Sequence, residues 1–256
     1  MKNKTSTYVK YAIGEIALVM VGILLALQVS NWNQGVQKEK LELKLLGKLQ
    51  EDLTNMYGDI ANDLKTMQLG DRSHFRILDY MQKNETYKDS MCFDFHWLAK
   101  DEYIYPVTST YDVIKREGLN IVKNDSIRMG VQLAFENFFS RLVRTNAFYP
   151  NIEEFFSPYF QKNFTPNKNE DLIFKEQFYG YTQTFPYKKR VNDKTYTIAI
   201  GYVPKDFEKL KKDEEFSMLM QQAYSYRTYK INRYKSAKYV IEELQKLIDK
   251  ELKNRQ

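Results

Sequence analysis

The chain of 256 residues is long enough for one or two domains, and its 43% apolar and 28% charged residues exclude disorder throughout. Ten glycines and six prolines are too few for a sandwich or barrel with many tight turns, and the single cysteine, Cys92, excludes an intramolecular disulfide framework. The formal net charge is +6, and the 20 tyrosines and 16 phenylalanines indicate an interior rich in aromatic rings.

An apolar segment, residues 11–29, lies near the N-terminus, and its only strongly polar side chains are Glu15 and Gln28. A helix of this length spans roughly 28 Å, close to the thickness of the hydrocarbon core of a bilayer. Tyrosines before the segment and Trp32 after it lie where aromatic rings favour the membrane interface. We therefore predict a single transmembrane helix over residues 11–32.

A cleaved signal peptide is the alternative, because the central apolar stretch, residues 16–27, is short and three lysines precede it. No clean small-residue cleavage site follows, which favours a retained anchor. The same lysines, with no acid before Glu15, predict a cytoplasmic tail over residues 1–10. The bulk of the chain is then expected on the other side of the membrane.

Two features of the predicted span are suited to a role beyond anchoring the chain in the membrane. Glu15 lies about one turn inside the span, where an ionisable group is a functional candidate, although it could instead reach the headgroups or pair with Lys10. Gly22 and Ala26 form a small-residue pair suited to close helix packing. The residues predicted to mediate association within the membrane are Gly14, Glu15, Leu18, Gly22 and Ala26.

After Trp32 the apolar residues recur every three or four positions, which is typical of an amphipathic helix. They are Leu41, Leu45, Leu49, Leu53, Met56, Ile60, Leu64 and Met67. The spacing predicts a stalk helix over residues 33–69 that ends near Gly70, followed by a shorter helix over residues 72–82. Residues 70–256 are expected to form a helical domain outside the membrane.

Capping residues and glycines mark further helices in residues 70–256. Ser109 has capping-box spacing with Asp112, Gly118 is placed for a left-handed C-terminal residue, and Asn124 or Asp125 is expected to cap the next helix. The expected helices cover roughly residues 109–117, 125–144, 150–160, 207–212 and 214–252.

A small β-hairpin is predicted near residues 184–203, because residues 191–194 are a turn signal and residues 196–203 alternate and are β-branched. The last helix carries an apolar stripe that is expected to pair antiparallel with the stalk, giving an elongated bundle with coiled-coil character. The stripe consists of Met220, Tyr224, Ile231, Tyr234, Ile241, Leu244, Ile248 and Leu252. The predicted fold class is therefore mainly α.

The segment KYAIGEIALVMVGILLALQVSNWN, residues 10–33, resembles the N-terminus of a family of bacterial membrane proteins known only as a domain of unknown function. The segment STYDVIKREGLNIVKNDSIR, residues 109–128, and the helix rich in tyrosine and arginine after Asp213 are similar to the same family. The resemblance implies a Gram-negative bacterium, an inner-membrane anchor and a mostly helical extramembrane domain, here expected in the periplasm. It implies no activity and carries over no catalytic residue.

The sequence has few residues in patterns typical of a metal site or a catalytic site. Cys92, Asp94 and His96 lie close together, but packing of the aromatic residues between them explains the pattern, and we predict no metal site and no cofactor. No nucleophile elbow, H-E-x-x-H helix or Gly-rich phosphate loop occurs, so we predict no catalytic residue. Paired acids such as Glu153 and Glu154 are expected in the first turns of helices, where they favour the helix dipole.

The segment YSYRTYKINRYKSAKY, residues 224–239, interleaves tyrosines with cations, a pattern that can bind single-stranded nucleic acid. At helical spacing, however, Arg227, Lys230 and Lys235 are expected on solvated flanks of the apolar stripe. We therefore predict no nucleic-acid partner, and a solvated face that meets anionic lipid or an acidic protein.

We therefore expect a non-enzymatic, membrane-anchored interaction or scaffold protein that contacts the bilayer and associates with itself or a protein partner through its span and long helices. The alternative is a periplasmic sensory or small-ligand-binding module that signals through a partner. An enclosed apolar pocket with convergent polar groups would favour the sensor, and a flat exposed apolar patch the scaffold. An enzyme would need carboxylates with perturbed pKa values clustered in a cleft.

Overall fold

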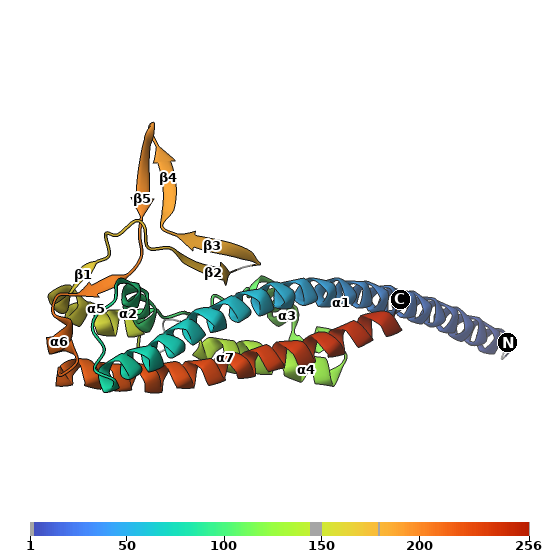
Figure 1. Cartoon of the computed structure of the whole chain (residues 1–256). Helices are drawn as coiled ribbons and strands as arrows, with labels where there is room; N and C mark the ends of the chain where they lie inside the picture. Colours follow the sequence, from blue (N-terminus) through green and yellow to red (C-terminus); the bar gives the residue numbers. More distant parts are fainter. Residues whose placement is uncertain (1–2, 144–149, 179, 256) are drawn as a thin grey trace.

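The protein is described here from a computed structural model that covers residues 3–143, 150–178 and 180–255, with side chains from Ile13 onward. The side chains of the N-terminal lysines and tyrosines up to Tyr11, and the expected helix end at Arg144, lie outside the part of the chain that the structure describes. The described chain is mainly helical, as predicted, and its helices form an elongated bundle with strands projecting from one side (Figure 1).

One helix, α1 (Asn3–Gln82), contains both the apolar segment and the amphipathic stalk. It continues through Gly70, so the expected helix end at Gly70 and the separate helix over residues 72–82 are wrong. A Cβ atom on Gly70 would lie 2.8 Å from Nε of Arg227 and 2.8 Å from the carbonyl oxygen of Trp97. The glycine is therefore needed for close packing of neighbouring elements against α1, and it does not end the helix.

The second long helix, α7 (Glu214–Asn254), lies antiparallel against α1, as predicted (Figure 1). Gln50 donates a hydrogen bond to Asp249 over 3.0 Å, and Tyr57 donates one to Glu242 over 2.7 Å. The stalk stripe is buried apart from its first leucine, which is half-buried. On α7 the predicted stripe is buried through its middle, but Tyr224 is exposed, which corrects that expectation.

Shorter helical segments pack along this pair. They are η1 (Asp89–Met91), α2 (Cys92–Ala99), α3 (Ser109–Glu117), η2 (Leu119–Ile121), α4 (Asp125–Gln132), η3 (Leu133–Phe138), η4 (Phe139–Arg141), α5 (Ile152–Asn163) and α6 (Phe207–Leu210). Asn124 caps α4 as predicted, because its side chain accepts hydrogen bonds from two backbone N–H groups of the first turn. Helix α3 begins at Ser109, as predicted, but its N-cap residue is Thr108 and not the expected Ser109. Gly118 ends α3 with φ of 90°, as expected.

The strands form three antiparallel pairs. β1 (Phe164–Pro166) pairs with β6 (Tyr202–Pro204), β2 (Phe174–Phe178) with β3 (Tyr181–Phe185), and β4 (Tyr187–Val191) with β5 (Lys194–Ile198). The β4–β5 pair confirms the predicted hairpin, and its turn residues Asn192 and Asp193 both have positive φ, as a two-residue hairpin turn requires. The other two pairs were not predicted.

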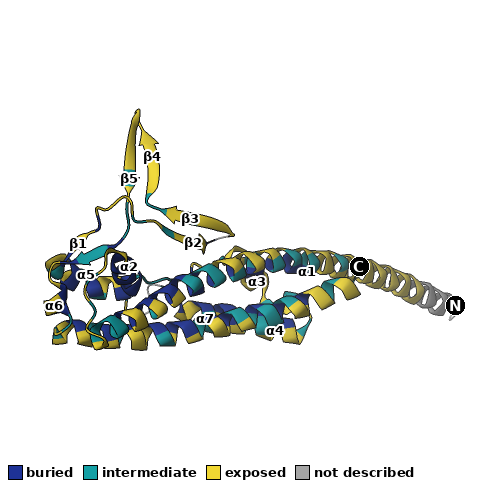
Figure 2. Cartoon of the chain, in the orientation of Figure 1, coloured by how far each residue is buried: buried dark blue, intermediate teal, exposed yellow. Residues whose placement is uncertain are grey.

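The two hairpins β2–β3 and β4–β5 are here called the arm; β2–β3 lies beside the helical bundle and β4–β5 stands clear of it (Figures 1 and 2). The arm is joined to α1 through Lys65, whose ammonium group lies 3.0 Å from the carboxylate of Glu176 and donates to the carbonyl of Gln177. These contacts fix the base of the arm on α1, near the end of the bundle that lies away from the N-terminus (Figure 1).

Two large apolar clusters form the core. The first lies between α1, α7 and the α3–α4 region and consists mostly of aliphatic side chains. The second joins α2, α5, α6 and the start of α7, and confirms that aromatic rings fill much of the interior. Its rings are Phe95, Phe156, Tyr159, Phe160, Phe164, Phe207 and Phe216.

Replacing Gly70 by alanine is expected to destabilise the protein by about 1–3 kcal/mol, because the added methyl group overlaps the Arg227 guanidinium and a backbone oxygen. Gly58→Ala, in the same helix, is the matched control: a Cβ there has no atom within 4 Å, and it should stabilise the helix by up to about 1 kcal/mol. Urea unfolding of both variants measures the difference. Equal effects of the two substitutions would contradict the packing role of Gly70.

Candidate functional site

The first part of α1 exposes an apolar surface. Every described side chain from Ile13 to Trp32 is exposed; Leu18 is 77% and Trp32 72% exposed (Figure 2). Among the described helices, α1 is long and apolar enough to cross a membrane. Such a run of apolar side chains is unfavourable in water, and a bilayer would cover it.

The predicted association residues Gly14, Glu15, Leu18, Gly22 and Ala26 all lie in this exposed part of α1. Four of them follow one another at intervals of four residues and share a face, while Glu15 lies one position away. A Cβ atom on either glycine would meet no atom within 4 Å. Since no described part of the chain packs on the two glycines, the association role of this face stays a prediction.

A buried ionic junction joins α7 to the end of α2 and the loop after it, beside Gly70 of α1; its main residues are Asp101, Arg227 and Lys230. Lys230 lies 2.7 Å from Asp101, and the exposed fractions of the two side chains are 2% and 1%. Arg227 is fully buried and donates to the carbonyl of Leu98, at the C-terminal end of α2, where a cation is favoured by the helix dipole. The expectation that Arg227 and Lys230 are solvated is therefore wrong, whereas Lys235 is exposed as expected.

The three candidates Cys92, Asp94 and His96 do not converge on one point. The Asp94 carboxylate accepts hydrogen bonds from Ser73 (3.0 Å), Tyr80 (2.7 Å) and the guanidinium of Arg76, and so ties α2 to α1. Burial raises the pKa of Cys92 to about 11 and lowers the pKa of His96 to about 3, so both are uncharged at neutral pH. Among the described residues, no group of three or more such side chains is placed for a metal ion.

A pocket of about 460 Å³ lies between α1, the end of α2 and the arm, and is here called the arm pocket. Polar side chains from α1 and from the loop after α2 form one part of its wall. Apolar and aromatic side chains of α2 and the arm form the other. The lining residues are Asn62, Asp63, Thr66, His96, Trp97, Lys100, Glu102, Phe178, Gln183, Phe185, Tyr187, Ile198 and Ile200.

Two carboxylates in the arm pocket have raised pKa values. Asp63 is 9% exposed; burial chiefly, and then the neighbouring acids Glu102 and Asp59, raise its pKa to about 7, and the nearby Tyr234 hydroxyl opposes this only in part. Burial also raises the pKa of Glu102, and the nearby hydroxyl of Thr66 opposes this only in part. Sequence reasoning missed both, because Asp63 and Glu102 are far apart in the chain and belong to no motif.

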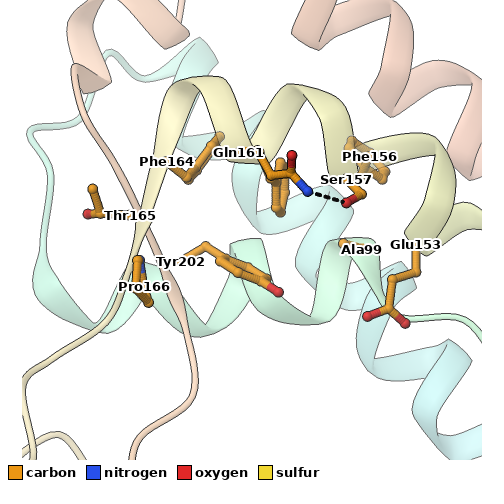
Figure 3. A pocket seen from close by; sticks show the side chains of 10 residues that line it. Ala99, Glu153, Phe156, Ser157, Gln161, Phe164, Thr165, Pro166 and Tyr202 are labelled. Atoms are coloured by element: carbon orange, nitrogen blue, oxygen red, sulfur yellow. Dashed lines mark hydrogen bonds between the residues drawn. The ribbon is translucent and has the colours of Figure 1, made fainter.

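A second pocket, of about 430 Å³, lies between α5, the end of α2 and the β1–β6 pair (Figure 3). Its wall is formed largely by Phe156, Phe164 and Tyr202, and Gln161 donates to Ser157 over 3.2 Å. Its charged lining residue, Glu153, lies in the first turn of α5 as expected and pairs with Lys100 over 3.2 Å. This pocket therefore lacks the paired acids of the arm pocket.

Comparison with known proteins gives one match. A family model described as a family of unknown function (DUF6090) matches residues 15–166, which is more than half of the chain. The matched residues include most of the N-terminal segment and all of residues 109–128, and they confirm the resemblance to an uncharacterised family; α7 lies outside them. No curated protein and no solved structure matches the chain.

Lys230→Met is expected to destabilise the protein by about 3 kcal/mol or more, because it leaves the Asp101 carboxylate buried without its cation. Lys235→Met, on the exposed side of the same helix, should change the free energy of unfolding by no more than about 0.5 kcal/mol. Urea unfolding near pH 7 measures both. A loss for Lys230→Met as small as for Lys235→Met would contradict the junction.

Asp63→Asn is expected to stabilise the protein by up to about 4 kcal/mol at pH 8 and to have little effect near pH 4. The folded protein holds the Asp63 proton up to about pH 7, whereas the unfolded chain releases it near the ordinary value of 3.8. The wild type therefore loses stability as the pH rises between these values, and the amide does not. Denaturant unfolding at both pH values measures the difference, and an effect of the same size at both would contradict the buried carboxylate. Asp193→Asn, on the exposed hairpin turn, is the control.

Proposed function

This chain belongs to the family of unknown function DUF6090, and on that premise we propose that it is a membrane-anchored, non-enzymatic interaction protein whose arm binds an acidic protein partner. The observation that carries the proposal is the exposed, basic and aromatic arm, fixed on the same helix as the apolar segment.

The anchor in this proposal is the apolar part of α1, retained in the bacterial inner membrane. The lysines before Glu15 support a cytoplasmic N-terminus, with the bundle and the arm in the periplasm. The absence of a helix break between the apolar segment and the described core supports a rigid link between them.

The arm is held far from the bilayer in this arrangement. Its base is at Lys65, and the helix from Trp32 to Lys65 has a length of about 50 Å at about 1.5 Å per residue. A five-residue strand adds only about 17 Å, so the arm does not reach back to the lipid in which α1 is anchored. This distance favours a protein partner over the surface of the same membrane.

The chemistry of the arm points to an acidic partner. The β4–β5 hairpin exposes Lys188, Lys189, Arg190 and Lys194, against the single acid Asp193. Tyr181 and Tyr196 are 57% and 52% exposed on the two hairpins. Exposed tyrosines and arginines are enriched at protein interfaces, and the net positive charge of the hairpin complements an acidic surface.

The proposal is non-enzymatic because the deeply buried acids of the described chain other than Asp63 are held in structural ion pairs. Asp94 and Asp101 are held in ion pairs that join helices. The arm pocket does hold two carboxylates with raised pKa values, as an enzyme would need, but no serine or cysteine is among the described residues that line it.

Site-specific photo-crosslinking in intact cells tests the proposal, with the photoreactive residue at position 191 of the full chain. We expect a crosslink to a protein through an acidic segment of that protein, identified by mass spectrometry of the crosslinked peptide. The triple variant Lys188→Glu, Lys189→Glu, Arg190→Glu should reduce the crosslink at least about 10-fold, because it reverses the charge of the hairpin.

The matched control reverses three exposed lysines of α1, Lys40, Lys44 and Lys48, and should leave the crosslink unchanged. Equal crosslinking by the arm variant would contradict the proposal. So would crosslinks to lipid, to nucleic acid or to a protein segment without acidic residues. A crosslink to an acidic segment of a second copy of this chain would replace the separate partner with self-association.

A further inference from the structure

We propose that the arm pocket is a binding site for an organic cation, namely an amine or substituted ammonium group carried on a small apolar body. This inference concerns a different part of the arm from the basic hairpin surface, and it holds whether or not that surface has a protein partner.

Asp63 is the first reason. It lines the pocket, it is nine-tenths buried, and no lysine or arginine of the described chain forms an ion pair with it. Its described neighbours are the hydroxyl of Tyr234 and two further acids, Glu102 and Asp59. A buried carboxylate in such surroundings is costly unless a cation meets it.

Other deeply buried acids of the described chain show the contrast. Glu42 lies 2.8 Å from Arg255, Asp101 lies 2.7 Å from Lys230, and Asp94 is paired with Arg76. This fold thus places a basic side chain beside each of these three acids. Asp63 has no such basic partner, and it lines a pocket that a ligand can enter.

The cations near the pocket are already engaged. Lys100 lines the pocket, but its ammonium group pairs with Glu153 over 3.2 Å. Lys65 pairs with Glu176 and donates to the arm backbone. His96 is neutral because burial lowers its pKa to about 3. The pocket therefore becomes negatively charged when Asp63 and Glu102 ionise, which excludes an anionic ligand and favours a cationic one.

Aromatic rings supply the second requirement for an organic cation. Trp97, Phe178, Phe185 and Tyr187 line the pocket; Trp97 and Phe178 stack on each other with centroids 5.9 Å apart, and the ammonium group of Lys65 lies 5.6 Å from the centroid of Phe178. Ring faces attract ammonium groups, and the apolar wall accepts the rest of the ligand. A volume of about 460 Å³ fits a small organic molecule and is far larger than a bare metal ion needs.

Binding should tighten as the pH rises. An ammonium group pairs with the ionised form of Asp63, whose pKa is about 7 in the free protein, so a ligand at lower pH has to displace the proton. The ionised fraction, and with it the apparent affinity, is expected to increase about 10-fold from pH 6 to pH 8. The groups that face this carboxylate are Asp59, Glu102 and Tyr234.

The test is isothermal titration of the purified full chain in detergent with 2-phenylethylamine, compared with 2-phenylethanol, which has the same shape without the charge. We expect binding of the amine at pH 8 that is at least about 10-fold tighter than binding of the alcohol, and about 10-fold tighter than binding of the amine at pH 6. Trp97 lines the site and should report binding through its fluorescence.

Asp63→Asn should weaken amine binding at least about 10-fold at pH 8 and abolish the pH dependence. Because this variant is expected to be more stable than the wild type at that pH, lost binding is not a folding defect. Asp193→Asn, at the exposed turn of the arm, should bind as the wild type does. Equal affinity for the alcohol, unchanged binding by Asp63→Asn, or no amine binding at millimolar concentration would overturn the proposal. None of these results depends on the protein partner of the arm.

Discussion

The structure depends on α1 being one continuous helix that meets two environments. Its first part has no partner in the described chain and exposes apolar side chains on all faces, whereas its second part buries an apolar stripe against α7. The transition between the two is marked by the C-terminal end of α7, where Arg255 pairs with Glu39 and Glu42. Because the helix has no hinge between these parts, the position of the whole bundle relative to a membrane follows from the position of the apolar segment.

At the other end of the α1–α7 pair, the bundle is held together by buried charges. Asp94 and Asp101 each join an element outside the long helices to α1 or α7 through a cation. Removing one member of such a pair is costly, whereas the intact pair adds little to stability and mainly fixes how the elements fit together. Asp63 departs from this pattern. Because of its raised pKa, Asp63 is expected to lower the stability of the protein at neutral pH, and residues that do so at the wall of a pocket are candidates for function.

Much of the helical framework could be predicted from the sequence, because apolar periodicity reports which face of a helix is buried. Periodicity cannot show that a polar residue is buried because a distant segment supplies its partner. Arg227 and Lys230 look like solvated flanks, and only the fold brings Asp101, more than a hundred residues earlier, to meet them. The prediction for Gly70 is wrong for a similar reason, since the sequence does not distinguish a glycine that ends a helix from one that allows close packing of a neighbouring element. The β4–β5 hairpin has a turn signal and was predicted, whereas the β1–β6 pair and the arm pocket depend on contacts between distant segments and were not.

The central claim is that α1 holds the arm away from the bilayer in which it is anchored, and fluorescence quenching tests it directly. The full chain would be placed in lipid nanodiscs whose headgroups carry a quencher, with a fluorophore on a cysteine at position 189 of the arm or at position 34 beside the apolar segment. The account predicts strong quenching at position 34 and none at position 189, because about 50 Å of helix separates the arm from the lipid. Quenching at position 189 as strong as at position 34 would contradict it.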